Sequence, residues 1–423
     1  MKTSGFIPDV FLGGNKVRVL GIISEYNPLH NGHVYQMSEA RKQSGADALV
    51  CVMSGNYVQR GEAAVADKWL RTRMALASGA DLVVEIPTLF AMSGAQSFAR
   101  AGVRLALASG IDILSFGCET ADLPLLRLLA DFLAEETEEY KSLLRVGLAQ
   151  GKGFAASRGE AVKQLLGDRA ADALEQPGVI LGVEYLMALQ KYGAEKTEIC
   201  PVQRIGTAHG AEDAEGEYIS ASAIRRRLQA GLSYEEAMPQ SSVQLWRQGA
   251  MPDPSAFTKQ FYWKLAEKGE RVLAETPEIG EGLENRIARC AKQYCSMEEL
   301  VQEVSCKRYP AARIRRGLMN FCLGITEETR RSVGWENGPS YLRILGIGPR
   351  GEELLKRIRE KAELPILTQP SAELEGLTRQ AQELFREETR YTDYYTLALP
   401  GGMWHGRGRE YREKILKNKE NKR

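Results

Sequence analysis

This chain of 423 residues is poor in the residue types that build disulfide scaffolds and metal centres, with seven cysteines and four histidines. The cysteines are odd in number and scattered, and no two of them form a Cys-x-x-Cys pair. Such usage is typical of reduced thiols in a cytoplasmic protein and argues against a disulfide framework or a zinc site. We therefore expect a cytoplasmic protein without a metal site built from cysteine.

Long apolar runs and an excess of charge of one sign are absent as well. No apolar run reaches the ~20 residues of a transmembrane helix, and residues 1–16 lack the apolar stretch of a signal peptide. We therefore expect no membrane partner, and nothing in the sequence indicates a stable protein partner. The net charge of +1 gives no indication of a nucleic-acid partner, so only local patches can do so.

The first third of the chain alternates short apolar runs with amphipathic segments. Gly45, Gly79 and Gly110 each follow a predicted helix, where a left-handed cap is favoured. Such alternation is typical of a parallel sheet with crossover helices, so we predict an α/β, Rossmann-like domain over residues 17–238. Its predicted strands are 17–23, 48–53, 82–86, 113–116 and 199–205, and its predicted helices are 33–43, 69–78, 93–108 and 222–230.

The remaining pattern is mostly helical. A helical insertion is predicted over about 122–190, with one long amphipathic segment at 123–148 and a second helix at 180–190. After a proline-containing linker, residues 239–423 are predicted to form a mainly helical C-terminal region. Its helices are expected at 257–268, 283–293, 297–304 and 311–323, and a small α/β element at 341–345, 352–361 and 365–367.

A His-x-Gly-His motif follows the first predicted strand and a proline-containing turn. His30 and His33 open the next helix, whose free N–H groups and positive dipole end suit phosphate. Gly32 leaves room for a close approach, and both imidazoles can donate hydrogen bonds to oxygens whose charge grows during attack on an α-phosphate. The motif indicates nucleotidyl transfer from ATP. Metal ligation or a plain surface position is the alternative, although no cysteine or third histidine lies nearby.

Other polar segments follow the predicted strands and are expected to meet at the same edge of the sheet. These loops are 54–67, 117–120 and 204–209, and ligands bind beyond the carboxyl ends of parallel strands. Arg60 and Lys68 are candidate partners for phosphate or carboxylate. Ser220 and Ser222, with Arg225, begin a helix, where they either cap its N–H groups or hold a phosphate there.

A basic cluster lies in the helical half. Residues 306–326 contain no acidic side chain, and arginine at helical spacing can follow a nucleic-acid backbone. A solvated basic face is the alternative. The candidates for RNA binding are Lys307, Arg308, Arg313, Arg315 and Arg316.

From about Val17 to the C-terminal region, the sequence closely resembles the bacterial tRNA(Met) cytidine acetate ligase family. The resemblance rests on several long motifs in the family's order, at 25–33, 54–62, 79–87, 180–185, 309–316 and 341–346. It implies a nucleotidyltransferase-like first domain and a tRNA-binding second region. Carried over by motif, the ATP-binding residues are Ile23, Ser24, Glu25, Tyr26, Asn27, Pro28, Leu29, His30, Asn31, Gly32, His33, Val34, Tyr35, Gln36, Gly117, Arg204 and Ile205.

One departure from the family concerns its Pro-Asn-Asn-Ile-Leu-Gly run, which supplies an ATP-contacting asparagine. Here that run begins Pro177-Gly178-Val179, so the side-chain contact is missing. We expect nucleotide affinity to be altered and an asparagine at 178 or 179 to restore it. The segment 207–210 also differs from the family's usual run.

The resemblance implies an ATP-dependent ligase that converts acetate to acetyl-adenylate. It then transfers the acetyl group to N4 of the wobble cytidine of elongator tRNA(Met), giving N4-acetylcytidine. His30 and His33 are the expected catalytic residues, and Mg²⁺ is expected to neutralise the leaving pyrophosphate. Two alternatives remain at this point: a small-molecule adenylyltransferase of cofactor synthesis, and a non-catalytic protein that binds ATP and RNA.

Overall fold

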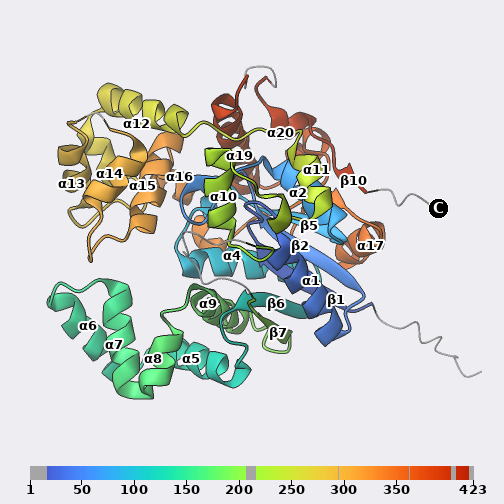
Figure 1. Cartoon of the computed structure of the whole chain (residues 1–423), viewed down its shortest axis with the longest axis horizontal. Coiled ribbons are helices and arrows are strands. Elements are labelled where there is room, and N and C mark those ends of the chain that lie inside the picture. The colour runs from blue at the N-terminus through green and yellow to red at the C-terminus, as the bar shows by residue number, and fades with distance from the viewer. Residues whose placement is uncertain (1–16, 206–215, 294, 362, 402–405, 419–423) are drawn as a thin grey trace, which may run out of the picture.

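The computed structural model shown in Figure 1 describes residues 17–205, 216–293, 295–361, 363–401 and 406–418. An eight-stranded sheet runs through it in the order β10-β8-β5-β2-β1-β6-β7, and β9 pairs with β8. The central strands pair in parallel, which confirms the predicted Rossmann-like α/β fold. They are β1 (Val19–Ser24), β2 (Ala48–Ser54), β5 (Leu82–Ile86), β6 (Ile113–Cys118) and β7 (Glu198–Gln203).

Successive side chains of the central strands enter opposite layers, as the period of two of a β-strand requires. In β1, Val19 and Ile23 belong to one hydrophobic cluster, whereas Leu20 and Ile22 belong to another. The first cluster is covered by α4 (Ala95–Ala108) and α9 (Pro177–Lys191). The second is covered by α1 (Asn31–Ser44), α2 (Lys68–Ala77), α10 (Ala221–Ala230) and α11 (Gln240–Trp246).

The insertion between β6 and α9 forms a helical lobe, drawn in teal and green in Figure 1. The predicted single segment at 123–148 is wrong, because the chain turns at Glu136, whose φ of 46° is left-handed. Thr137 then accepts a hydrogen bond from the Tyr140 N–H and starts a new helix. The helices of this first lobe are α5 (Leu123–Glu135), α6 (Glu138–Ala149), α7 (Phe154–Leu166) and α8 (Asp168–Ala173).

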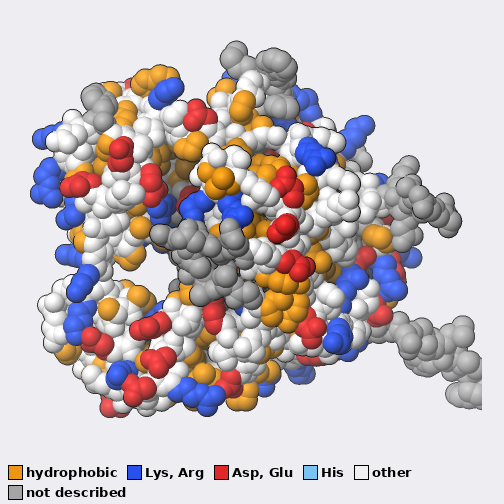
Figure 2. Space-filling view, viewed as in Figure 1, with side chains coloured by type: hydrophobic (Ala, Val, Ile, Leu, Met, Phe, Trp, Pro, Cys, Tyr) orange, Lys and Arg blue, Asp and Glu red, His pale blue; other side chains and the backbone are white. Residues whose placement is uncertain are grey.

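A second helical lobe follows the linker, on the same side of the sheet in Figure 1. Its helices are α12 (Pro254–Lys268), α13 (Leu283–Cys290), α14 (Met297–Val304), α15 (Ala311–Leu323) and α16 (Glu327–Ser332). The two lobes meet where Gly153 approaches the backbone of Lys307. A Cβ added at Gly153 would lie 2.6 Å from the Lys307 carbonyl oxygen. Figure 2 shows an opening between the two lobes.

After the second lobe the chain returns to the sheet. β8 (Leu342–Ile347) pairs antiparallel with β5, and β10 (Leu416–Lys417) pairs parallel with β8. The expected small α/β element is therefore part of the main sheet, although its strands come long after residue 238. The other elements here are α17 (Gly351–Lys361), β9 (Ile366–Leu367), α18 (Pro370–Glu373), α19 (Arg379–Ala398) and α20 (Arg409–Arg412).

Among the described residues, no helix combines the length and the apolar character needed to cross a bilayer.

Candidate active site

A cavity of about 610 Å³ opens at the carboxyl ends of β1, β6 and β7. Ser24 and Glu25 enter it from the end of β1, and Gly117 enters it from β6. The first turn of α1 and the start of α10 line it as well. Segments far apart in the sequence therefore meet at the crevice predicted for a parallel sheet.

The two histidines hold the start of α1 by a reciprocal pair of hydrogen bonds. His30 is the N-cap, and its Nδ1 accepts a hydrogen bond from the Gly32 N–H at 3.1 Å. His33 Nδ1 accepts one in return from the His30 N–H at 3.2 Å. The imidazole rings lie 3.8 Å apart between centroids, and Tyr26 packs edge-on against His33. Contacts within the protein thus define the orientation of both rings.

This arrangement sets the hydrogen-bonding state of both rings. Because each Nδ1 accepts, the network assigns the proton of the neutral ring to Nε2. Burial, followed by the proximity of His30 and Arg204, holds the pKa of His33 well below its usual range. His33 is therefore a neutral imidazole with one N–H donor at physiological pH, which suits it to donate to phosphate oxygens.

Gly32 makes room for His30 itself. A Cβ at Gly32 would lie 2.9 Å from His30 Cε1, so any other residue would displace the capping ring. The sequence suggested that a glycine here lets a phosphate approach. The structure adds a second reason for glycine, which is the space that the His30 ring needs. Gly32 also lines the cavity.

The start of α10 forms the second polar wall. Ser220 is its N-cap and accepts a hydrogen bond from the Ala223 N–H, and its hydroxyl lies 2.9 Å from that of Ser222. The predicted helix cap is therefore present, and both serines line the cavity. Arg225 donates from Nη1 to the Asn27 carbonyl at 2.8 Å, and its Nη2 lies 3.5 Å from Glu62. Arg225 thus connects α10 to the loop between β1 and α1, and it lines the cavity too.

Another part of the cavity wall is built around Glu119. Its carboxylate lies 3.3 Å from Arg204 and accepts hydrogen bonds from the Gly178 and Val179 N–H groups at the start of α9. A Cβ at Gly178 would lie 2.5 Å from Glu119 Oε2, and the Val179 side chain is fully buried. The acidic side chain therefore occupies the space next to position 178 and caps the helix itself.

Most of the predicted ATP-binding residues line the cavity. Tyr26, Pro28, Leu29, Asn31 and Val34 do not. Tyr26 and Leu29 pack in the hydrophobic core, and Asn31 donates to the Glu217 and Glu236 carbonyls. Tyr26, Leu29 and Asn31 therefore support the loop through contacts within the protein. Those that do line the cavity are Ile23, Ser24, Glu25, Asn27, His30, Gly32, His33, Tyr35, Gln36, Gly117, Arg204 and Ile205. Residues 206–209 of the predicted third loop, and the rest of the divergent 207–210 segment, lie outside the described residues.

Comparison with known proteins agrees with this geometry. A model of the HIGH nucleotidyl transferase family matches residues 17–407. The tRNA(Met) cytidine acetate ligase of Acetivibrio thermocellus is 35% identical over 95% of this chain and its own whole length. That of Caldanaerobacter subterraneus is 36% identical over 90% of this chain and 96% of its own. The chain belongs to the tRNA(Met) cytidine acetate ligase family.

Solved structures of the acetate ligase family have the same fold. The crystal structure of Thermotoga maritima TmcAL bound with alpha-thio ATP superposes with a TM-score of 0.86 at 29% identity, covering 95% of this chain and 99% of that one. Its apo form superposes with a TM-score of 0.87 at 30% identity, covering 95% of this chain and 100% of that one. The similarity therefore extends over the sheet and both helical lobes.

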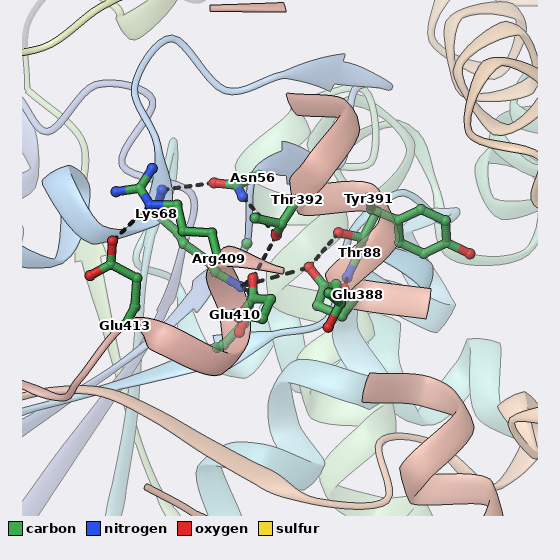
Figure 3. A network of polar contacts seen from close by, with 12 residues as sticks. Asn56, Lys68, Thr88, Glu388, Tyr391, Thr392, Arg409, Glu410 and Glu413 are labelled. Atoms are coloured by element: carbon green, nitrogen blue, oxygen red, sulfur yellow. Dashed lines mark hydrogen bonds and ion pairs between the residues drawn. The ribbon is translucent and has the colours of Figure 1, made fainter. Parts of the chain in front are cut away.

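Lys68 is not a phosphate ligand in this member of the acetate ligase family. It is fully buried, lies 2.5 Å from Glu85 and pairs closely with Glu410 (Figure 3). Glu388 is 3.9 Å from the same ammonium group. Burial lowers the pKa of Lys68, but the carboxylates more than offset this and raise it above its usual value. Arg60, the other candidate, lines the cavity.

The predicted RNA-binding residues divide into two groups. Lys307 and Arg308 are exposed in the turn before α15. The arginines of α15 are instead paired with acids from other elements: Arg313 with Glu281, Arg315 with Glu298 and Glu62, and Arg316 with Glu278. Residues 306–326 contain no acid, but acids from segments distant in sequence pair with the arginines of α15. Arg315 also lies beside the hairpin of β3 (Tyr57–Val58) and β4 (Glu62–Ala63).

The sequence motifs did not identify every cavity residue of this family member. Glu119, Gln59, Tyr185 and Tyr218 line the cavity without having been named individually as candidate site residues. Glu119 and Gln59 lie in loops that were expected at the strand ends, so position along the chain was the available signal. Tyr185 ends the 180–185 motif of α9, and Tyr218 lies shortly before α10. Neither motif nor local pattern indicated that these tyrosines line a site instead of the core.

Proposed function

We propose that this chain uses ATP to convert acetate to acetyl-adenylate and then acetylates N4 of the wobble cytidine of elongator tRNA(Met), giving N4-acetylcytidine. The observation that carries the proposal is the convergence of the His30 and His33 rings with the capped start of α10 in one cavity. It is supported by relatives named tRNA(Met) cytidine acetate ligase that match nearly the whole chain. A cytoplasmic location fits such a substrate.

In the first step the acetate carboxylate attacks the α-phosphorus of ATP and pyrophosphate leaves. Both imidazoles are positioned as neutral donors from Nε2, and hydrogen bonds that strengthen as the phosphate gains charge lower the barrier. Ser220, Ser222 and the first N–H groups of α10 provide further donors for the phosphates. Arg204 and Gly117 line the same cavity, and we assign them to the nucleoside end of ATP.

Magnesium usually accompanies ATP, held by phosphates, water and one or two carboxylates. Among the described residues, the carboxylates lining the cavity are Glu25 and Glu119, and Glu119 is already engaged with α9 and Arg204. The cavity thus lacks a protein cage for the ion, and we assign no step to it. The described group of acids that lies close enough to bind an ion is Glu85, Glu388 and Glu410, where the Lys68 ammonium is paired instead.

Acetate-dependent exchange of radiolabelled pyrophosphate into ATP tests the first half-reaction. We expect exchange with acetate and none without a carboxylic acid. Mass spectrometry of wobble nucleosides, in tRNA from cells with and without the gene, tests the second. Exchange that requires a different acid, or unchanged N4-acetylcytidine after deletion of the gene, would contradict the proposal.

A further inference from the structure

The second half-reaction requires a proton acceptor that the nucleotide motif does not provide. When N4 of cytidine attacks the carbonyl carbon of acetyl-adenylate, a C–N bond forms and the bond from that carbon to the phosphate oxygen breaks. AMP leaves with the electron pair, and one N4 proton must be lost, because the product amide keeps only one. A base within hydrogen-bond reach of N4 is therefore needed.

The histidines are poorly suited to accept that proton. Each Nδ1 is occupied by the hydrogen bond that closes α1, and each Nε2 bears the proton that a phosphate oxygen can accept. Burial lowers the pKa of His33, which makes its ring a weak base. Tyr185, another titratable group on the cavity wall, has a pKa raised by burial and would be a phenol at physiological pH. Neither kind of group supplies the missing base.

Two carboxylates line the cavity among the described residues, Glu25 and Glu119. Glu119 is committed, because it pairs with Arg204 and caps α9. Glu25, the first residue after β1, has no ion pair within 4.0 Å in the described part of the chain. Its Oε1 accepts one hydrogen bond, from the Gln59 N–H at 2.9 Å. Within the described residues, the Glu25 carboxylate is therefore held by one hydrogen bond, while Arg225 and Arg60 act on it from beyond ion-pair distance.

The surroundings of Glu25 adjust its basicity. Burial raises its pKa above the ordinary value and the negative charge of Glu62 adds to this, whereas the Gln59 N–H, Arg225 and Arg60 lower it. Arg71 of α2 faces it at longer range and donates to its backbone carbonyl at 2.7 Å, and Tyr185 faces it from α9. A carboxylate whose pKa lies above the usual range holds a proton better than one in water, and such shifts favour a base near neutral pH.

We propose that Glu25 is the general base of acetyl transfer, accepting the proton of the attacking amine. This assignment rests on the proposed function and deepens it. The Gln59 N–H fixes Oε1, which leaves Oε2 available to the amine. After AMP has left, the proton passes from Glu25 to solvent.

Glu25→Gln is the decisive variant, because its amide oxygen still accepts the Gln59 hydrogen bond. Because Glu25 lies in the predicted ATP-binding loop, we expect some loss of acetate-dependent pyrophosphate exchange at saturating ATP, but a much smaller loss than that of acetyl transfer. Single-turnover transfer from preformed acetyl-adenylate to tRNA should fall by ~10²–10⁴-fold, the usual contribution of general base catalysis. Wild-type transfer should slow at acidic pH as Glu25 becomes protonated, whereas the slow transfer by Glu25→Gln should not depend on pH in that range. Glu25→Asp should recover part of the rate.

Glu119→Gln is the matched control from the same cavity. We expect this variant to change nucleotide binding, but its acetyl-transfer rate should still fall at acidic pH as in wild type. The inference is overturned if Glu25→Gln transfers acetyl at the wild-type rate, or if its transfer rate still falls at acidic pH as that of wild type does. It is equally overturned if pyrophosphate exchange falls as much as transfer, since Glu25 would then act in the first step. Failure of the proposed function is distinct, because it would show as absence of acetyl-adenylate in the wild-type protein.

Discussion

At the scale of single residues, the histidine motif combines a structural role with a chemical one. The hydrogen bonds between the His30 and His33 rings and the backbone close α1 and leave both Nε2 atoms as donors. The sequence motif was informative because all of its parts lie within one helical turn. Glu119 was not identified, because its partners Gly178, Val179 and Arg204 are about 60 to 85 residues away and only folding brings them together.

His33→Ala should nearly abolish adenylate formation. Loss of one preorganised donor typically costs ~10²–10³ in rate, while loss of the cap should lower the free energy of unfolding by only about 0.5–2 kcal/mol. Acetate-dependent pyrophosphate exchange measures the first effect and denaturant unfolding the second. Exchange near the wild-type rate in a folded variant would exclude His33 from catalysis.

At the scale of secondary-structure elements, helices and strands with a strong local pattern were predictable, whereas their partners were not. The break at Glu136 was missed because apolar periodicity continues across it into α6. The return of β8 and β10 to the sheet was missed because strand pairing between β5 and β8 joins residues more than 250 positions apart. The acids facing α15 were missed for the same reason. Local sequence indicates that a strand must pair or that a charged side chain requires a partner, but it does not indicate which distant segment provides the partner.

The start of α9 gives a prediction at this scale. The family resemblance suggested that asparagine at 178 or 179 would restore an ATP contact, but the structure argues against it. Val179→Asn would bury an amide in the core, and an unsatisfied polar group costs about 1–3 kcal/mol. Gly178→Asn would displace Glu119. We expect lower stability for the first and ATP affinity that is unchanged or weaker for both, by denaturation and titration calorimetry. Tighter ATP binding in either variant would contradict this interpretation.

At the scale of the whole molecule, a buried polar cluster joins residues 68–88 of the first domain to residues 388–410 near the C-terminus. Figure 3 shows Lys68 of α2 among carboxylates from α19 and α20, with Glu388 also accepting hydrogen bonds from the Thr88 N–H and hydroxyl. Burial, together with the charge of Glu85, raises the pKa of Glu388 to about 8. Glu388 is thus protonated in the folded protein at pH values where it is ionised in the unfolded chain.

This shift predicts a pH dependence of stability. A carboxyl whose folded pKa is raised stabilises fully below its unfolded pKa, and this contribution is lost as pH rises toward about 8. The loss is at most about 1.4 kcal/mol per pH unit. Glu388→Gln mimics the protonated form, so its stability relative to wild type should increase with pH across that window. Glu383→Gln, at a partly exposed position of the same helix, is the control and should show no such trend. Parallel curves for Glu388→Gln and wild type would show that Glu388 does not titrate there.

The turn before α15 allows a test of whether the second lobe binds RNA while the sheet domain binds the nucleotide. Because Arg315 and Arg316 are paired with acids and adjoin the β3–β4 hairpin, replacing them would disturb the loop beside the cavity as well as any RNA surface. Lys307 and Arg308 are exposed and stand at the contact between the lobes. These two residues therefore test RNA binding without touching the nucleotide site.

Replacing both Lys307 and Arg308 with glutamate should weaken tRNA binding. The slope of log affinity against log salt should fall by roughly 0.7–0.9 for each phosphate that the protein no longer neutralises. Acetate-dependent pyrophosphate exchange without tRNA should stay at the wild-type rate. The control replaces Lys356 and Arg359, which are exposed on α17 on the opposite side of the molecule in Figure 1. If that pair weakens tRNA binding equally, the effect is one of net charge. If Lys307→Glu/Arg308→Glu binds tRNA normally, this turn is only a solvated basic surface and the RNA lies elsewhere.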